Sequence, residues 1–182
     1  MTTADAEPRT YVRPVEARDR RDFLAMTRAS AALHHPWISP PTTERMFQHY
    51  LARIESGERV GLLVCRSHDD RIAGVVNVNG IMRGTFLSAS LGYYAAADCA
   101  GHGLMTDGLR HAVTHAFGSL GLHRLEANIQ PDNVRSIALA RRAGFVLEGY
   151  SRRFLYIEGA WRDHERWAIY DERDTLLPAH HC

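Results

Sequence analysis

The chain has 182 residues, of which 45% are hydrophobic and 24% are charged, as is typical of a globular domain with a substantial core. Its 22 basic residues, all of them arginines, nearly balance 21 aspartates and glutamates. Overall charge therefore does not mark a general nucleic-acid or membrane binder, and a polyanion would need a local basic patch. The three cysteines, Cys65, Cys99 and Cys182, have no paired spacing, which argues against a disulfide framework and a cysteine zinc site.

The termini carry no recognisable targeting signal. The N-terminal segment lacks a basic stretch followed by an apolar core, and no apolar run approaches the ~20 residues of a membrane span. We therefore expect a cytoplasmic protein without a membrane or direct nucleic-acid partner. A single domain is expected over residues 10–172, with a flexible N-terminus over 1–9 and a C-terminal tail over 173–182. No metal site is expected, because His111 and His115 have no third ligand nearby.

The first half of the chain predicts a strand, two helices and an antiparallel meander. The prolines of HHPWISPP, residues 34–41, separate the two helices, because proline cannot continue a helix. Thr42 or Thr43 can cap the second helix, and Gly57 ends it. Strands are expected over residues 10–15, 59–67, 72–82 and 84–94, and the first helix over 17–33.

Two glycines mark a strand-to-helix corner in CAGHGLM, residues 99–105. The run before them alternates apolar and small or polar residues, and residues 103–120 space apolar side chains at helical intervals. Such a corner suits a phosphate, because the free N–H groups and the dipole of a helix start favour negative charge, and glycine lets the backbone come close. A tight connection without a ligand explains the corner equally well.

A second helix start lies in PDNVRSIALARRAGF, residues 131–145. It follows a strand expected over 123–130, and Asn133 is a good N-cap with Ser136 in the first turn, although both residues could simply cap and pack. Two donor-rich helix starts near one sheet edge suit a long ligand with phosphates at one end and a polar chain at the other. A last hairpin is expected over residues 145–170, with its turn at Glu158 and Gly159.

Taken in this order, the segments resemble the GNAT acyltransferases, and within them the ribosomal-protein alanine/serine N-terminal acetyltransferases. The resemblance runs from about Tyr11 to Tyr170 and is carried by YVRPVEARD, PWISPP, LGYY followed by AGHGLM, HRLEANIQPDNVRSIALARRAGFVLEGY, and YIEGAWRDHERWAI. It implies an α/β (α+β) fold with a mostly antiparallel mixed central sheet, flanked by helices and splayed between the fourth and fifth strands. Acetyl-CoA, the implied cosubstrate, would lie in that splay.

The resemblance also implies the residues that hold CoA. Backbone groups of one strand would bond the pantetheine arm, N–H groups of the corner would cradle the pyrophosphate, and the second helix start would flank the thioester. These are respectively Tyr93, Tyr94 and Ala95; Cys99, Ala100, Gly101, His102, Gly103, Leu104 and Met105; and Asn133 and Ser136. One departure is Asp98, where the family often has Gln or Arg, since a carboxylate repels a pyrophosphate unless it turns to solvent. Cys99 is expected as a small buried residue rather than a reactive thiol.

Acetyl transfer to an amine needs a neutral amine and a proton for the leaving thiolate, and alignment alone can supply much of the acceleration. Ser136 is the first candidate acid, because the resemblance places its hydroxyl near the sulfur, and Tyr156 on the last hairpin is the second. Glu126 is the candidate base, on the polar face of its strand. A solvated carboxylate paired with Arg124 is an equally good interpretation of Glu126, and no single residue need act as the base.

The acceptor pocket is expected to involve the HHPWISPP loop, with His35 and Trp37 as candidate substrate contacts, together with the last hairpin. Trp37 is more often a packing residue than a substrate platform. The resemblance favours a protein or peptide N-terminal α-amine as acceptor. The alternatives are a small amine, such as a polyamine, amino sugar or peptide antibiotic, and a non-catalytic acyl-CoA-binding module.

Two further questions concern nucleotide binding and assembly. A dinucleotide-binding fold shares the G-x-G signal, but here the third glycine position is Thr106 and the preceding strand is not a continuous apolar run. We therefore set that alternative aside.

A homodimer is a possible assembly, and nothing in the sequence decides it.

Overall fold

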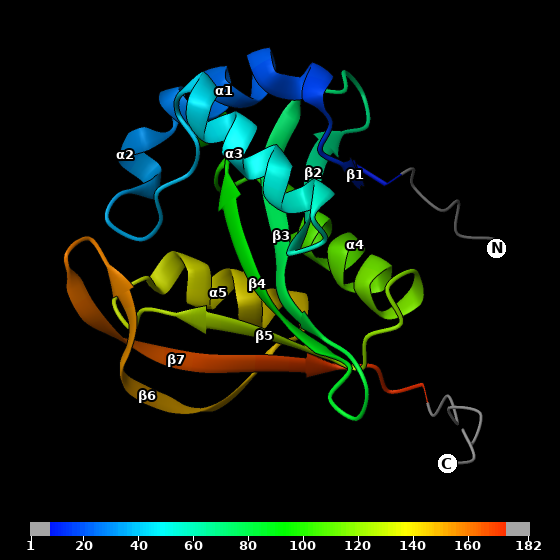
Figure 1. The fold of residues 1–182 in the computed structure, drawn as a ribbon, viewed down its shortest axis with the longest axis vertical. Coiled ribbons are helices and arrows are strands. Elements are labelled where there is room, and N and C mark those ends of the chain that lie inside the picture. The colour runs from blue at the N-terminus through cyan, green and yellow to red at the C-terminus, as the bar shows by residue number, and fades with distance from the viewer. Residues whose placement is uncertain (1–7, 174–182) are drawn as a thin grey trace, which may run out of the picture.

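One mixed sheet of seven strands, in the order β1-β2-β3-β4-β5-β7-β6, forms the framework in a computed structural model that describes residues 8–173 (Figure 1). All neighbouring strands are antiparallel except β4 and β5, which are parallel. The strands are β1 Thr10–Pro14, β2 Arg59–Arg66, β3 Ile72–Met82, β4 Ser88–Ala95, β5 Arg124–Ile129, β6 Val146–Ile157 and β7 Ala160–Tyr170. This confirms the expected α/β fold with a mostly antiparallel mixed sheet.

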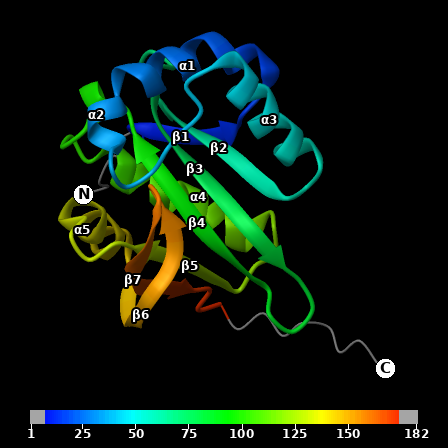
Figure 2. The same ribbon diagram turned by 60° about the vertical axis from the view of Figure 1, so that its left-hand side comes forward.

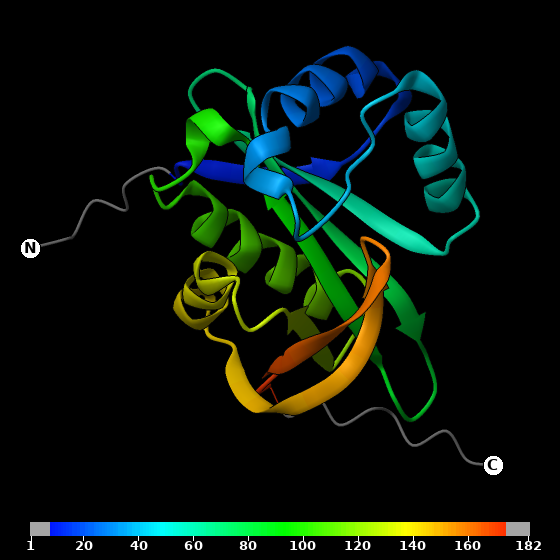
Figure 3. The same cartoon turned by 90° about the vertical axis from the view of Figure 1, so that its left-hand side faces the viewer.

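Helices cover both faces of the sheet (Figure 3). On one face α1 and α3 pack over a core that includes Phe23, Phe47 and Val75, and on the other α4 and α5 pack over a larger core that includes Leu109 and Leu125. The helices are α1 Arg20–Ala29, α2 Ala31–His34, α3 Glu44–Glu55, α4 Leu104–Gly118 and α5 Val134–Ala143, with short 3-10 helices η1 Ala17–Asp19 and η2 Ala97–Cys99.

Two elements differ from their expected bounds. The helix expected over residues 17–33 is divided, because Ser30 leaves helical geometry at φ −102° and ψ 7° and its hydroxyl accepts the N–H of Ala97 at 2.9 Å. The strand expected to begin at residue 84 begins at Ser88 instead. Gly84 and Leu87 have φ values of +69° and +40°, so the chain is still turning there.

The sheet opens between β4 and β5, as the resemblance implied. These strands pair only from Ser88–Leu91 to Arg124–Ala127. Beyond that seam they diverge, so that residues 92–95 of β4 keep β3 as a neighbour and have no strand on their other side (Figure 1). Backbone donors and acceptors on that edge are therefore left for another partner.

The hairpin of β6 and β7 reaches across to the loop between α2 and α3 (Figure 2). Ser39 in that loop donates a hydrogen bond to Glu158 in the hairpin turn at 2.8 Å, although the two residues are 119 positions apart. This contact joins the two segments that were expected to form the acceptor pocket, and their part in binding an acceptor stays a prediction.

The ends of the described chain show one correction. Arg9 was expected in the flexible N-terminus, but its Nε donates to Asp107 of α4 at 3.1 Å, and Ser67 donates to the carbonyl of Pro8. Residues 1–7 and 174–182, with most of both expected tails and Cys182, lie outside the described residues.

Three further observations concern residues 8–173 alone. Cys65 and Cys99 are both buried free thiols. No helix in this part of the chain is long and apolar enough to cross a membrane. Likewise, no three His, Cys, Asp or Glu side chains gather there closely enough to hold a metal ion.

Candidate active site

The turn into α4 presents a row of free backbone donors. Gly101 and Gly103 have φ values of +82° and +79°, a left-handed conformation that other residues adopt at a cost. Among the described residues, the N–H groups of residues 101–105 have no acceptor, while Thr106 and Asp107 already donate to the carbonyl of Gly103. Five consecutive free N–H groups at the positive end of a helix form a concave site that suits an anion.

This row of free donors is shorter than the sequence suggested. The N–H groups of Cys99 and Ala100 close the 3-10 turn by donating to Ala96 and Ala97, at 3.0 and 3.3 Å. They are therefore not available to a ligand. Cys99 is buried, and burial together with the charge of Asp98 raises the pKa of its thiol, as expected of a packing residue.

Cationic side chains flank the same turn. Arg9 donates to the carbonyl of His102 at 3.1 Å, and Arg142 reaches the hydroxyl of Thr106 at 3.5 Å. The carboxylate of Asp98, which departs from the family pattern, forms an exposed ion pair with Arg71 at 3.1 Å. Free donors, flanking guanidinium groups and a neutralised carboxylate together fit a pyrophosphate.

The start of α5 meets β4 across the splay. Asn133 caps α5 by accepting the N–H of Ser136 at 3.2 Å, and the hydroxyl of Ser136 donates to that of Tyr93 at 2.9 Å. Burial raises the pKa of Tyr93 to about 12, so its hydroxyl keeps its proton at neutral pH. The sequence had assigned only the backbone of Tyr93, and no local pattern shows that its ring turns toward α5 while that of Tyr94 turns toward α1 and α3.

His34 fixes the end of β4 and was missed in the sequence. Its Nε2 lies 2.8 Å from the carbonyl of Ala95, and because a carbonyl only accepts, Nε2 carries the proton. Burial lowers the pKa of His34, which keeps the ring neutral. The ring also meets that of Tyr94 at a centroid distance of 5.3 Å. Of two adjacent histidines, only the fold shows that His34 is buried and His35 is exposed.

Glu126 is held in an ion-pair network. Arg124 donates to it from Nη2 at 2.9 Å and also binds Glu148 of β6. The strand alternates as expected, with Leu125 and Ala127 buried on the other face. The arrangement matches the alternative interpretation of a paired strand carboxylate, and Glu126 as a base stays a prediction.

Tyr156 lies near the tip of the β6–β7 hairpin. It is 63% exposed, and its ring packs edge-on against Trp161 with centroids 5.6 Å apart. No contact joins it to Tyr93 or Ser136, so the structure does not bring the two candidate acids together.

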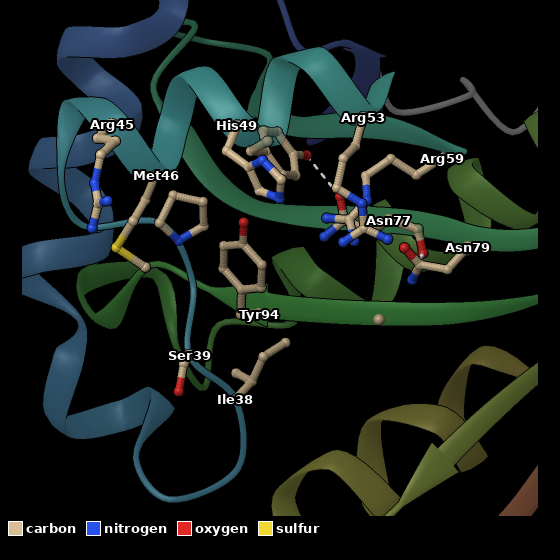
Figure 4. A pocket seen from close by; sticks show the side chains of 13 residues that line it. Ile38, Ser39, Arg45, Met46, His49, Arg53, Arg59, Asn77, Asn79 and Tyr94 are labelled. Carbon is tan, nitrogen blue, oxygen red and sulfur yellow. Dashed lines mark hydrogen bonds between the residues drawn. The ribbon is translucent and has the colours of Figure 1, made fainter. Parts of the chain in front are cut away.

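A cleft of about 590 Å³ lies beside the splay, under α3 and over the strands β2, β3 and β4 (Figure 4). It reaches β4 at Gly92, the first residue after the seam with β5. Its lining mixes apolar, amide and cationic side chains: Ile38, Ser39, Pro41, Arg45, Met46, His49, Tyr50, Arg53, Arg59, Asn77, Asn79, Gly92 and Tyr94.

The loop between α2 and α3 does line this cleft, but not through the residues chosen from the sequence. Ile38 and Ser39 face it, whereas neither His35 nor Trp37 does. His35 is exposed, and Trp37 is half-buried and donates its N–H to the carbonyl of His34 at 2.8 Å. Sequence reasoning missed the residues from α3 and the strands, because only the fold brings them to one place.

Comparisons with known proteins agree with this geometry. Residues 9–146 match the family described as an acetyltransferase (GNAT) domain. The chain is 33% identical over 177 residues to a probable N-acetyltransferase of Bacillus subtilis, covering 90% of this chain and 95% of that protein. It is 40% identical over 101 residues to the ribosomal protein uS5-alanine N-acetyltransferase of Escherichia coli, covering 56% of this chain and 52% of that protein.

Two more relatives bear on the ligand and the acceptor. The structure of Mycobacterium smegmatis RimJ in complex with CoA-disulfide superposes with a TM-score of 0.81 at 28% identity, covering 91% of this chain and 84% of that one. The spermidine N(1)-acetyltransferase of E. coli is 23% identical over 165 residues, covering 89% of this chain and 86% of that protein.

Proposed function

Because the chain belongs to the GNAT acetyltransferase family and is an acetyl-CoA-dependent N-acetyltransferase, we propose that its acceptor is the α-amine at the N-terminus of a protein or peptide. The observation that carries this proposal is the cleft of about 590 Å³ that reaches β4 at the splay, where backbone and amide groups can bind a peptide. The similarity to the uS5-alanine enzyme supports it, and ribosomal-protein N-termini are therefore the first peptides to try.

The donor side of the site is proposed to work largely through backbone. The N–H groups of residues 101–105 bind the pyrophosphate, and the open edge of β4 at residues 92–95 bonds the pantetheine arm. Acetyl-CoA supplies the activated acetyl thioester. Asn133 fixes the first turn of α5, so that the hydroxyl of Ser136 stays beside that of Tyr93 at the edge of the splay.

The chemical step then needs little from charged side chains. As the amine nitrogen bonds to the acetyl carbon and the carbon–sulfur bond breaks, the hydroxyl of Ser136 donates its proton to the departing thiolate and then takes up the proton that the amine loses, passed on by Glu126 or by water. Tyr93 accepts the hydrogen bond of the Ser136 hydroxyl and so holds that hydroxyl in place, and burial raises the pKa of Tyr93 so that it keeps its own proton. Glu126, or water beside it, remains the proposed acceptor of the amine proton, and Tyr156 the second candidate acid.

The second candidate acceptor is a small amine. The similarity to a spermidine acetyltransferase favours it, although that similarity is lower in identity than the similarity to the uS5-alanine enzyme. A polyamine carries several positive charges, whereas the cleft is lined by three arginines, Arg45, Arg53 and Arg59. Like charges at a binding site disfavour the ligand, so the peptide remains the first choice.

The test combines binding with turnover. Calorimetry with acetyl-CoA, and with NADH as the control, measures the donor site, and thiol release is then followed with N-terminal peptides and with small amines. Faster release with peptides supports the proposal. Release with polyamines or amino sugars alone contradicts it and identifies the alternative acceptor class.

Two further expectations stay predictions. The cytoplasmic location can be measured by fractionation. A homodimer can be measured by sedimentation, and the outer strand β6 offers a surface for it, because Val146, Leu147 and Tyr150 are each more than half exposed.

A further inference from the structure

The cleft beside the splay is cationic. Arg45, His49 and Arg53 reach it from α3, and Arg59 reaches it from β2 (Figure 4). Within residues 8–173, no aspartate or glutamate lines the cleft. The nearly neutral composition of the whole chain therefore conceals a local excess of positive charge at this site.

Two of these arginines have no carboxylate partner. Arg53 pairs with Glu58 at 2.8 Å, but neither Arg45 nor Arg59 forms an ion pair in the part of the chain that the structure describes. Arg59 is half-buried, its guanidinium lies 5.3 Å from the centre of the Tyr50 ring, and its Nε is buried without a hydrogen-bond partner. A partly buried charge without a counterion costs free energy, which a bound anion would offset.

The floor of the same cleft holds further unpaired polar atoms. Tyr94 is only 5% exposed and its hydroxyl makes no hydrogen bond with the described residues, and the side-chain oxygen of Asn79 is likewise buried and unpaired. Next to them, Tyr50 donates to the side-chain oxygen of Asn77 at 2.6 Å. Buried polar groups in proteins are normally hydrogen-bonded, so the floor beneath the cleft is polar and incompletely paired among the described residues.

The cleft meets β4 at its open segment. Gly92 and Tyr94 line the cleft from residues 92–95, which have no strand on one side, whereas Tyr93 between them turns its ring to the other face of the sheet, toward Ser136. A side chain at Gly92 would approach the amide nitrogen of Asn79 to 3.4 Å, so glycine keeps this end of the cleft open. Two carboxylates contact lining residues from outside the cleft: Glu58 pairs with Arg53, and Glu158 at the hairpin turn accepts a hydrogen bond from Ser39.

We propose that the cleft selects an acceptor that carries a carboxylate close to its amine, with Arg45 and Arg59 as the residues that contact the carboxylate. This inference rests on the proposed function and specifies its acceptor: a peptide with acidic residues just after its N-terminal residue. Charge complementarity favours such a chain and disfavours a polycation.

The experiment compares two hexapeptides with an N-terminal alanine that differ only by Glu or Gln at positions two and three. The acidic peptide is expected to have a kcat/KM about tenfold higher at low salt, with most of the difference in KM, and the ratio should fall as salt is added. Free glutamate is a third substrate, which distinguishes a peptide from a small carboxylate-bearing amine. Binding of each peptide to CoA-saturated protein, measured by calorimetry, gives a readout that does not require turnover.

The variants assign the preference to the cleft. Arg59→Gln and the exposed Arg45→Gln are each expected to reduce the ratio between the two peptides severalfold, mainly through KM for the acidic one. Arg21→Gln removes the same charge from an exposed position on α1 that does not line the cleft, so its ratio should stay that of the wild type. Should Arg59→Gln fail to fold, Arg45→Gln alone still decides the result.

The outcomes separate the two proposals. Equal rates and affinities for both peptides, or a preference for the Gln peptide, would overturn the anionic acceptor while leaving the peptide N-acetyltransferase intact. Binding of acetyl-CoA without turnover of any peptide would contradict the proposed function, and peptide calorimetry would still test the charge preference. Better turnover of free glutamate than of either peptide would support the carboxylate contacts and replace the peptide with a small molecule.

Discussion

The two proposed binding regions beside the splay are built in different ways. The turn into α4 uses five consecutive backbone N–H groups, whereas the cleft uses side chains from α3, β2, β3, β4 and the loop after α2. A site made of backbone groups can be predicted from a short stretch of sequence, because the spacing of its glycines indicates a turn that leaves N–H groups free. A site made of side chains from separate elements becomes visible only once those elements are packed, and this is where enzymes on one fold come to differ in acceptor.

The largest effect is expected from Gly103→Val in the turn. A branched residue at φ +79° is strained, and its Cβ would lie 3.1 Å from Arg9, so acetyl-CoA affinity should fall by about 10–100-fold. Calorimetry measures the change. Gly118→Ala at the other end of α4, where a Cβ meets nothing within 4 Å, is the matched control, and equal losses in both variants would show that the turn is not the binding site.

Removing the hydroxyl between the two regions should lower kcat. For Ser136→Ala we expect a loss of about 10–100-fold with KM for acetyl-CoA nearly unchanged, because a proton donor is lost while backbone binding remains. Single-turnover kinetics measure the step, and Ser136→Thr should restore part of the rate. A wild-type kcat in Ser136→Ala together with a large loss in Tyr156→Phe would transfer the acid role to the hairpin.

A smaller effect is expected for Glu126→Gln. Because Arg124 already engages this carboxylate, water beside it can accept the amine proton in the variant, so kcat should fall by less than about threefold, with the pH profile of kcat/KM retained. The measurement is that pH profile. A loss above about a hundredfold, with the acidic limb of the profile displaced, would instead establish Glu126 as the base.

The smallest expected effect is on stability, through His34. Burial lowers the pKa of this histidine in the folded protein, so below the ordinary value of about 6.5 the unfolded chain takes up the proton first. The contribution of His34 to the free energy of unfolding is therefore fully present above pH 6.5. It is lost as the pH falls toward the lowered pKa of His34 in the folded protein. Urea unfolding between pH 5 and 8 should show a weaker acid dependence in His34→Gln than in the wild type. The same pH dependence of unfolding in the wild type and in His34→Gln would show that His34 does not cause the loss of stability in acid.

Much of the fold could be predicted because local patterns and tertiary packing agree. The alternation of β5, the Asn133 cap and the glycine turn appear in the structure as expected. Some failures are local, as in the late start of β4, but two come from contact between distant residues. Ser30 breaks a helix because its hydroxyl binds Ala97, and Arg59 enters the cleft because β2 pairs beside β3. No window of local sequence contains either fact.

The short seam between β4 and β5 has a mechanical consequence. Four residue pairs join strands β1–β4 to strands β5–β7. The two parts of the sheet are therefore paired with each other over a short stretch only. A ligand that is hydrogen-bonded along residues 92–95 takes the place of the strand segment that β5 does not supply. Such a ligand would then help to hold the two parts of the sheet together. Amide hydrogen exchange at residues 92–95 should slow when acetyl-CoA binds, and the two parts of the sheet should unfold more nearly as one unit.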